Sequence, residues 1–357
     1  MKLVKIISFV RGHVQGMRLS QLKGLVAMSE AVMKGAKLGV ASIGRGMRGE
    51  AKVKHRIKRV DRFLGNSGVS IYPVCRSFLK LLSKRGQRLV ILLDWTTVGQ
   101  WDILLASVPM CGRGIPVLWQ VCPRWGHELS RNRDERNFLL KLKAILPAGI
   151  EVIIVADRGF GRTELFRYLQ QLGFSYVIRV KGDVRVEGKR YSGILRRCHV
   201  NRATVMELGQ VWYRAGRPVL SRIVGFWDWK QKERWWLSTN LKLGGRKVIN
   251  IYSRRMQIEE MIRDEKNPRW GFGLRWVKLS NPHRWERMLL IAAVAYFILA
   301  LYGLDTLRTG EAHSFSSNTK RTLSILGCGM LYFAYAKASP KQLYQKLKPL
   351  IFKQNWG

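Results

Sequence analysis

The chain has 357 residues, 47% of them hydrophobic, so it is long enough to bury a substantial core in roughly two or three domains. Its 64 Lys and Arg outnumber 23 Asp and Glu, and the resulting net charge of +41, spread along the chain among aromatic residues, favours nucleic acid over anionic lipid as partner. Five widely spaced cysteines without a CxxC pair argue against a disulfide framework or a cysteine zinc site and favour a reducing cytoplasm.

Residues 1–85 are predicted to be helical and basic. Between residues 47 and 66, Val53, Ile57, Val60 and Leu64 recur at helical spacing. Few acidic residues balance the cations on the remaining surface of this helix, so we expect it to lie against the phosphates of a nucleic acid. The cations expected to make these contacts are Lys54, Arg56, Lys58 and Arg59.

From Gly86 the pattern becomes that of a mixed α/β domain. Short apolar runs separated by turn residues predict strands, and two amphipathic stretches predict helices. In chain order these are strands at 89–96, 102–109 and 115–122, a helix at about 131–146, a strand at 151–157, a helix at about 163–172 and a strand at 175–180. Three strands followed by helix–strand–helix–strand indicate the α/β class.

The second half of the chain is predicted to contain a β-rich insertion followed by helices. Residues 181–242 have β character and carry five of the 13 tryptophans, and helical periodicity resumes from about Val248 to Lys266. The uncharged run Met288–Leu304 is at the lower length limit for spanning a bilayer, and we expect it to be a buried core helix. A basic C-terminal region follows and contains one more apolar helix.

Two aspartates, Asp94 and Asp157, each end a predicted apolar strand. A carboxylate in that position is costly unless it is solvated, paired or bound to a metal. Two carboxylates on neighbouring strands can share a hard divalent cation such as Mg²⁺. Either aspartate alone is more often an ordinary strand-end residue, so the pair by itself is a weak signal.

The stronger signal is the predicted helix YSRRMQIEEMIRDEK, residues 252–266. Tyr252, Arg255, Glu259 and Lys266 lie at offsets of 0, 3, 7 and 14, which places them within roughly 60° of one another on a helix. A metal-binding carboxylate flanked by phosphate-binding cations suits phosphodiester chemistry. Glu260 points about 100° away and is expected to lie outside the site.

The order Tyr-x2-Arg-x3-Glu-x6-Lys resembles the signature of bacterial insertion-sequence transposases with an Asp-Asp-Glu active site, in their hairpin-forming, cut-and-paste branch. Asp94 in LLDWT and Asp157 in IVADRGFG match the two aspartates of that family. The resemblance covers about residues 85–305. It implies an α/β fold with a ribonuclease H-like catalytic domain at 86–305, a β-rich insertion at about 181–242, and flanking helical regions at 1–85 and 306–357.

By the same resemblance, the protein is expected to be a DNA transposase with Asp94, Asp157 and Glu259 as catalytic and metal-binding residues. Two Mg²⁺ ions, replaceable by Mn²⁺, would assist cleavage at the transposon ends, hairpin formation and opening, and strand transfer into target DNA. Arg255 and Lys266 would hold phosphates, and Tyr252 would contact the DNA backbone. The implied partners are double-stranded transposon ends and target DNA, bound by a homodimer in the bacterial cytoplasm at the nucleoid, with no membrane partner.

Hairpin formation bends the DNA end sharply and favours extrusion of a base onto an aromatic surface. Trp229, Trp235 and Trp236 are the candidates in the insertion, and for any one of them a place in a small β core is the alternative. Two further interpretations stay open. The chain could be a metal-dependent nuclease that cuts without joining, or a catalytically idle DNA-binding protein. A basic membrane-associated protein would rest on residues 288–304 alone.

Overall fold

The computed structural model describes the chain except for residues 1, 125–130, 215, 230–232, 316–322 and 355–357. The helices are α1 (Lys2–His13), α2 (Leu19–Met33), α3 (Val40–Gly46), α4 (Val53–Gly65), α5 (Tyr72–Leu82), α6 (Arg131–Ile145), α7 (Thr163–Gln171), α8 (Gly245–Ser253), α9 (Met256–Lys266), α10 (Pro282–Thr309), α11 (Ile325–Tyr335) and α12 (Pro340–Gln354). The strands are β1 (Arg88–Val98), β2 (Trp101–Met110), β3 (Arg113–Pro123), β4 (Glu151–Ala156), β5 (Ser175–Val180), β6 (Arg185–Gly188), β7 (Ser192–Ile194), β8 (Val205–Tyr213), β9 (Val219–Phe226) and β10 (Trp235–Thr239).

The described strands form one sheet in the order β3-β2-β1-β4-β5-β10-β9-β8-β6-β7. β1, β4 and β5 are parallel neighbours, whereas β2 and β3 are antiparallel to their neighbours. The chain passes through α6 before β4 and through α7 before β5, because parallel strands need a crossover connection. The first five strands, with their flanking helices, confirm the predicted α/β, ribonuclease H-like core.

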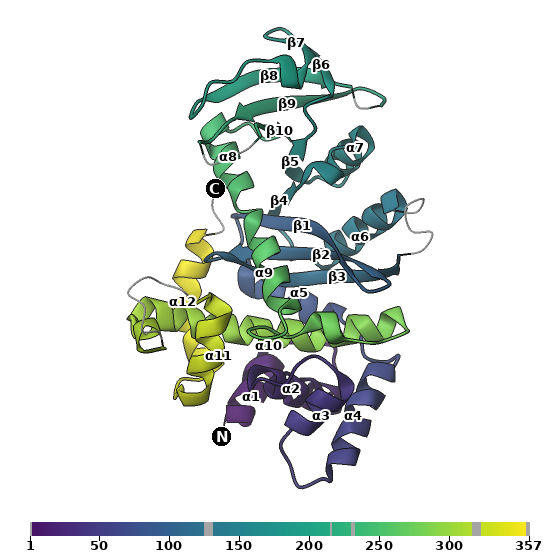
Figure 1. Ribbon diagram of the computed structural model, residues 1–357, viewed down its shortest axis with the longest axis vertical. Coiled ribbons are helices and arrows are strands. Elements are labelled where there is room, and N and C mark those ends of the chain that lie inside the picture. Colours follow the sequence, from purple (N-terminus) through teal and green to yellow (C-terminus); the bar gives the residue numbers. More distant parts are fainter. Residues whose placement is uncertain (1, 125–130, 215, 230–232, 316–322, 355–357) are drawn as a thin grey trace.

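The β-rich insertion continues this sheet instead of forming a separate body. β10 pairs antiparallel with β5, with Trp236 opposite Val180, and β9, β8, β6 and β7 follow outward. Without β10, β5 would be an edge strand with unpaired backbone groups. The sheet therefore has a core half (β3-β2-β1-β4-β5) and an insertion half (β10-β9-β8-β6-β7), seen in the middle and at the top of Figure 1.

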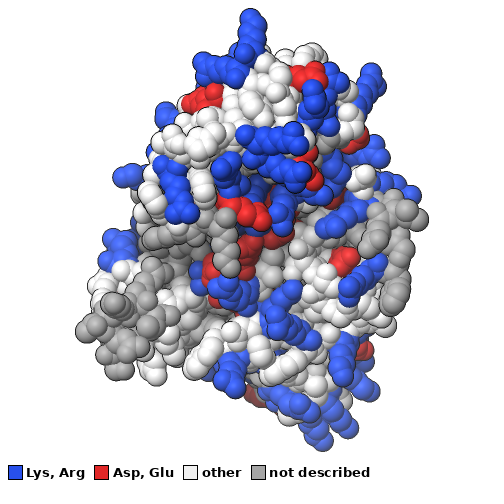
Figure 2. Space-filling view, turned by 45° about the horizontal axis from the view of Figure 1, so that its top comes forward, with Lys and Arg blue, Asp and Glu red and all other residues white. Residues whose placement is uncertain are grey.

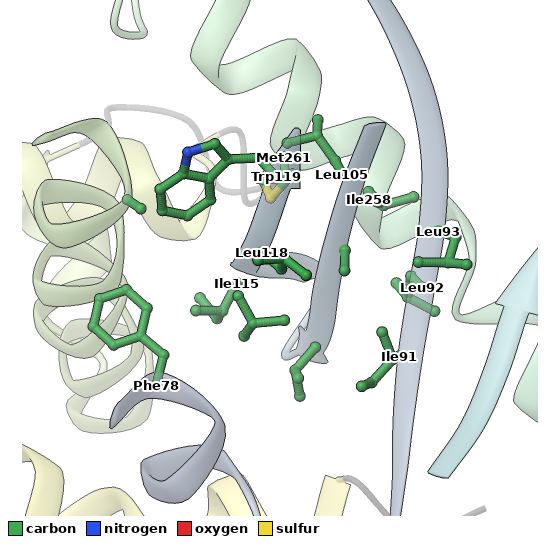
Figure 3. Packing of buried hydrophobic residues seen from close by; sticks show 14 of the residues in the cluster. Phe78, Ile91, Leu92, Leu93, Leu105, Ile115, Leu118, Trp119, Ile258 and Met261 are labelled. Atoms are coloured by element: carbon green, nitrogen blue, oxygen red, sulfur yellow. The ribbon is translucent and has the colours of Figure 1, made fainter. Parts of the chain in front are cut away.

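The core half is covered by helices that bury the apolar side chains of β1–β3. β1 begins with the run Leu89–Leu93, which is apolar on both of its faces and can therefore be buried on both. Figure 3 shows Leu93, Leu105 and Trp119 of the strands beside Ile258 and Met261 of α9. This packing fixes the position of α9 across β1–β3.

Helix α10 runs across the middle of the molecule, between the sheet and the N-terminal helices (Figure 1). By length and composition it is the one helix of the described residues that could cross a membrane, but its most apolar stretch is completely buried inside the fold. Gly303 and Gly329 let α10 and α11 touch along their backbones, because a Cβ at Gly303 would come within 1.9 Å of the Ile325 carbonyl oxygen. The expectation of a buried core helix is confirmed.

The expectation of one continuous helix from about Val248 to Lys266 is wrong. A turn at Arg254 and Arg255 separates α8 from α9. In this turn the Arg255 amide donates a hydrogen bond to the Tyr252 carbonyl. Helix α8 packs against β5 and the insertion strands, whereas α9 packs against β1, β2 and β3. A single straight helix does not follow both halves of a twisted sheet, and the break allows the change of direction.

Candidate active site

Two aspartates stand side by side where β1 and β4 run in parallel. Leu93 and Ala156 form the last pair of the parallel register. Asp94 and Asp157 are therefore the next residues along these two segments. Paired residues point to the same face of a sheet, which turns both carboxylates toward the same side. Asp157 directly follows β4, and its Oδ1 accepts a hydrogen bond of 2.9 Å from the Gly159 amide.

Helix α9 brings Glu259 to these aspartates. Its neighbours Ile258 and Met261 are buried against the sheet, and the Glu259 side chain stays 34% exposed. The Arg255 guanidinium joins the groups, because it lies 3.5 Å from Asp94 Oδ2 and donates a hydrogen bond to Glu259. Asp94 and Glu259, which are 165 positions apart, are thus brought to the same cation.

Burial and the neighbouring charges both act on the pKa of Asp94. Burial raises this pKa to about 6, Arg255 opposes the rise, and Asp157 and Glu259 add to it. All three side chains offer carboxylate oxygens, the ligands that Mg²⁺ and Mn²⁺ prefer, and a divalent cation would relieve their repulsion. The donor chemistry of the three residues therefore suits a divalent metal.

The Arg255 side chain occupies part of the space that such a metal ion would need. Among the residues that the structure describes, no three acidic, histidine or cysteine side chains are close enough to enclose a metal ion. The Arg255 guanidinium contacts both Asp94 and Glu259 instead. Burial alone would lower the pKa of Arg255, but Tyr252 and the acidic groups raise it, so the side chain stays charged.

Tyr252 reaches the same cluster from the end of α8. Its ring is buried and packs edge-on against Trp235, with 4.8 Å between the ring centroids. Burial raises the pKa of Tyr252 to about 12, with Arg255 and Arg179 opposing the rise, so the phenol is neutral at physiological pH. Because of the break between α8 and α9, Tyr252 meets Arg255 across a turn and not along one helical face.

Lys266, at the end of α9, lies beside the continuation of β1. Its Nζ donates a hydrogen bond of 2.9 Å to the Thr97 carbonyl, three residues beyond Asp94. Burial and the nearby Arg275 lower the pKa of Lys266. Glu260, by contrast, faces Arg113 of β3 at 3.6 Å and Arg263 at 2.7 Å, which agrees with its expected place outside the site.

The three candidate tryptophans have different environments. Trp236 is buried against Gly225, where a Cβ would come within 2.7 Å of the indole. Trp235 is half-buried against Tyr252, whereas Trp229 is 68% exposed. Of the three, Trp229 is the most exposed, and the Arg202 guanidinium lies over its ring at 5.0 Å from the centroid.

A basic cavity of about 580 Å³ opens next to the site, between the core half and the insertion half. Its lining includes Arg196, Arg234, Trp227 and Trp236, together with Arg158 and Arg179, which both pair with Glu233 of the same lining. Arg158 directly follows Asp157, and the Trp227 ring is flanked by the guanidinium groups of Arg202 at 4.6 Å and Arg234 at 4.9 Å. Sequence reasoning did not predict this cavity, because its lining comes from segments up to 78 positions apart.

The basic helix predicted near the N-terminus is α4. Lys54, Lys58 and Arg59 are exposed on it, whereas Arg56 is half-buried and donates a hydrogen bond to the Met47 carbonyl. Figure 2 shows basic side chains over much of one face of the molecule, with acidic side chains gathered near its centre. Three of the four predicted cations are therefore free to meet a phosphate backbone.

Sequence reasoning missed Glu135, a buried carboxylate that contacts the site from α6. It accepts a hydrogen bond of 3.0 Å from Trp95, the neighbour of Asp94, and pairs with Arg162 in the loop after Asp157. A signal was present, since Glu135 falls in line with the buried positions Phe138 and Leu142 of an amphipathic helix. An acidic residue in such a position needs a partner.

Comparison with known proteins identifies the family of this chain. A model of the family described as transposase DDE domain matches residues 106–298, more than half of the chain, including Asp157 and the whole of α9. No curated protein matches the chain. Enzymes with this domain act on DNA and generally use divalent metal ions. The chain therefore belongs to the transposase DDE domain family.

Proposed function

We propose that this protein is a cut-and-paste transposase whose active site is Asp94, Asp157 and Glu259. It cleaves double-stranded DNA at the ends of a bacterial insertion sequence, forms and opens a hairpin on each end, and joins the freed ends to target DNA. A homodimer that holds both ends, in the cytoplasm at the nucleoid, suits this task. The observation that carries the proposal is that Asp94 of β1 and Glu259 of α9 meet at Arg255, while Asp157 follows the neighbouring parallel strand at the position beside Asp94.

The three carboxylates would hold Mg²⁺, or Mn²⁺ in its place, which would activate the attacking oxygen and stabilise the leaving oxygen. In the first cut, water attacks the phosphorus at the transposon end and the strand breaks with a free 3′-OH. That 3′-OH then attacks the opposite strand and closes the hairpin. A second water opens the hairpin, and the 3′-OH finally attacks target DNA.

Arg255, Lys266 and Tyr252 orient the DNA in these steps. Arg255 exchanges its carboxylate partners for the phosphate beside the cut, where its planar fork can make two hydrogen bonds. Lys266, tied to Thr97, presents its charge to the next phosphate along. Tyr252 keeps its proton because burial raises its pKa to about 12, so it acts as a neutral hydrogen-bond donor.

The insertion half receives the base displaced by the hairpin bend. Trp229 offers the most exposed ring of the three candidates, and the arginine-lined cavity beside Asp157 can take a base and its phosphate. The exposed cations Lys54, Lys58 and Arg59 of α4 bind the backbone farther along the DNA.

The test is incubation of the full chain and Mg²⁺ with a DNA fragment that carries the terminal repeat of the element. We expect nicked, hairpin and excised products from the wild type, none from Glu259→Gln, and nearly wild-type products from the matched control Glu260→Gln. Equal cleavage by wild type and Glu259→Gln would remove Glu259 from the site. Cleavage without hairpins or joined products would identify a nuclease that does not transfer strands.

A further inference from the structure

Glu135 is the most deeply buried carboxylate close to the two aspartates. It is 2% exposed and lies on the face of α6 that packs inward with Phe138 and Leu142. Burial raises the pKa of Glu135, and Arg162, Trp95 and Arg131 oppose the rise. A buried carboxylate persists in a fold when its oxygens are paired, and here two different segments supply the partners.

One oxygen of Glu135 holds the segment that contains Asp94. The Trp95 Nε1 donates to Glu135 Oε1 at 3.0 Å, and the Arg131 guanidinium covers the Trp95 ring at 5.0 Å from its centroid. Successive side chains of a strand point to opposite faces. Because Trp95 is fixed toward α6, its neighbour Asp94 is fixed toward α9.

The other oxygen of Glu135 holds the loop that contains Asp157. The Arg162 Nη2 donates to Glu135 Oε2, and Nη1 of the same guanidinium donates to the Gly159 carbonyl at 2.6 Å. The Gly159 amide in turn donates to Asp157 Oδ1 at 2.9 Å. A continuous path of hydrogen bonds thus leads from Glu135 to the carboxylate of Asp157.

This bridge begins where the backbone ladder stops. The parallel pairing of β1 with β4 ends at Leu93 and Ala156, one residue before the two aspartates. Beyond that pair, Glu135 connects the two segments through side chains. Metal ligands need their spacing fixed by such outer partners, and loss of an outer partner typically weakens metal binding.

We propose that Glu135 is a positioning residue that sets the spacing of Asp94 and Asp157 for the metal, by binding Trp95 and Arg162 at once. The inference rests on the proposed function of these aspartates. Glu135 itself touches neither DNA nor metal. Loss of the Glu135 carboxylate should therefore weaken metal binding. This effect differs from a general loss of fold stability.

The test is a titration of the full-length protein with Mn²⁺, followed by electron paramagnetic resonance, with thermal unfolding measured in parallel. Glu135→Gln keeps the size of the side chain but loses the ion pair with Arg162. Glu151→Gln is the matched control, because Glu151 pairs with Arg88 across the same two strands at their other ends. Asp157→Asn reports on the metal site itself.

We expect Glu135→Gln to raise the Mn²⁺ dissociation constant about tenfold or more, and Glu151→Gln to leave it within about twofold of wild type. If folded Glu135→Gln protein binds Mn²⁺ with wild-type affinity, the positioning role is overturned. Loss of Mn²⁺ binding in Asp157→Asn would still support the proposed metal site in that case. Wild-type binding in Asp157→Asn would contradict the proposed site, and the positioning role with it.

If Glu135→Gln fails to fold, Trp95→Phe and Arg162→Lys each weaken one arm of the bridge. Weaker Mn²⁺ binding by either folded variant supports the role. Wild-type affinity in both overturns it.

Discussion

The core half and the insertion half of the sheet differ in how far their side chains are buried and fixed. In the core half, β1 and β4 are covered by helices on both faces, and adjacent residues on β1, Asp94 and Trp95, are fixed to α9 and α6 respectively. In the insertion half, tryptophans such as Trp212 and Trp229 stay exposed, and arginines line an open cavity. A rigid half suits groups that must keep their spacing, and an open, basic half suits a substrate that bends.

Variants in the two halves should therefore fail at different steps of the reaction. Substitutions in the core half should change the chemical steps while DNA binding persists. Substitutions in the insertion half should change hairpin formation while nicking persists.

The largest effect is expected for Asp157→Asn in the core half. Loss of one carboxylate from the cluster should lower the cleavage rate by about a thousandfold or more, roughly 4 kcal/mol in activation free energy. Single-turnover cleavage measures the rate, and a gel shift without divalent metal should show unchanged DNA affinity. Glu151→Gln, which changes an exposed carboxylate at the start of β4, far from the site, is the control. Cleavage by Asp157→Asn within tenfold of wild type would exclude Asp157 from catalysis.

A smaller and more selective effect is expected for Trp229→Ala in the insertion half. Stacking of a base on an aromatic ring contributes about 1–3 kcal/mol, so hairpin yield should fall about tenfold while first-strand nicking changes less than about twofold. Trp212→Ala, an exposed tryptophan on β8 of the same half, is the matched control. Equal losses in the two variants, or equal losses of nicking and hairpin, would argue against a stacking role for Trp229.

A still smaller effect is expected for the triple variant Lys54→Gln, Lys58→Gln and Arg59→Gln, outside both halves. If all three contact phosphates, the slope of log affinity against log salt should decrease by up to about 0.9 for each lost contact. Filter binding at several salt concentrations measures the slope. Arg56→Gln serves as comparison, because Arg56 bonds to Met47 and should leave the slope unchanged. An unaltered slope in the triple variant would remove α4 from the DNA interface.

The last effect concerns the stability of the fold and not the DNA chemistry. Glu265 of α9 is fully buried, and burial raises its pKa to about 8, with Asp264 adding to the rise and Lys266 opposing it. The folded state then keeps the proton that the unfolded state loses near pH 4.5, so stability is full below that pH and declines as pH rises to about 8.

The decline amounts to at most about 1.4 kcal/mol for each pH unit. Glu265→Gln should therefore match wild type near pH 5 and unfold a few degrees higher at pH 8, as measured by thermal denaturation. The same gain at both pH values would show that Glu265 does not titrate in this range.

The core half could be predicted from the sequence because its strands are short apolar runs bounded by turns. The run Leu89–Leu93 and the strand before Asp157 carry enough local signal to place β1 and β4 within two residues of their observed ends. The order of strands then follows from the need for crossovers between parallel neighbours. Glu259 could be distinguished from Glu260 by its spacing from Arg255 and Lys266 together with the family signature.

Features that depend on distant contacts could not be predicted in this way. The break at Arg255 separates helices that pack on different strands, and no Gly or Pro marks it in the sequence. The ranking of Trp229, Trp235 and Trp236 depends on their neighbours, such as Gly225 and Tyr252. Glu135 was an intermediate case, because its core position was visible in the sequence but its partners Trp95 and Arg162 were not.

The central claim is that Asp94, Asp157 and Glu259 share a divalent metal site. The most direct measurement is a crystal structure of the protein with a DNA end and Mn²⁺, in which anomalous scattering locates the manganese. The account predicts manganese at about 2.1 Å from carboxylate oxygens of these residues, with Arg255 moved from between Asp94 and Glu259 to a phosphate. Manganese bound elsewhere, with Arg255 still between the two carboxylates, would contradict it.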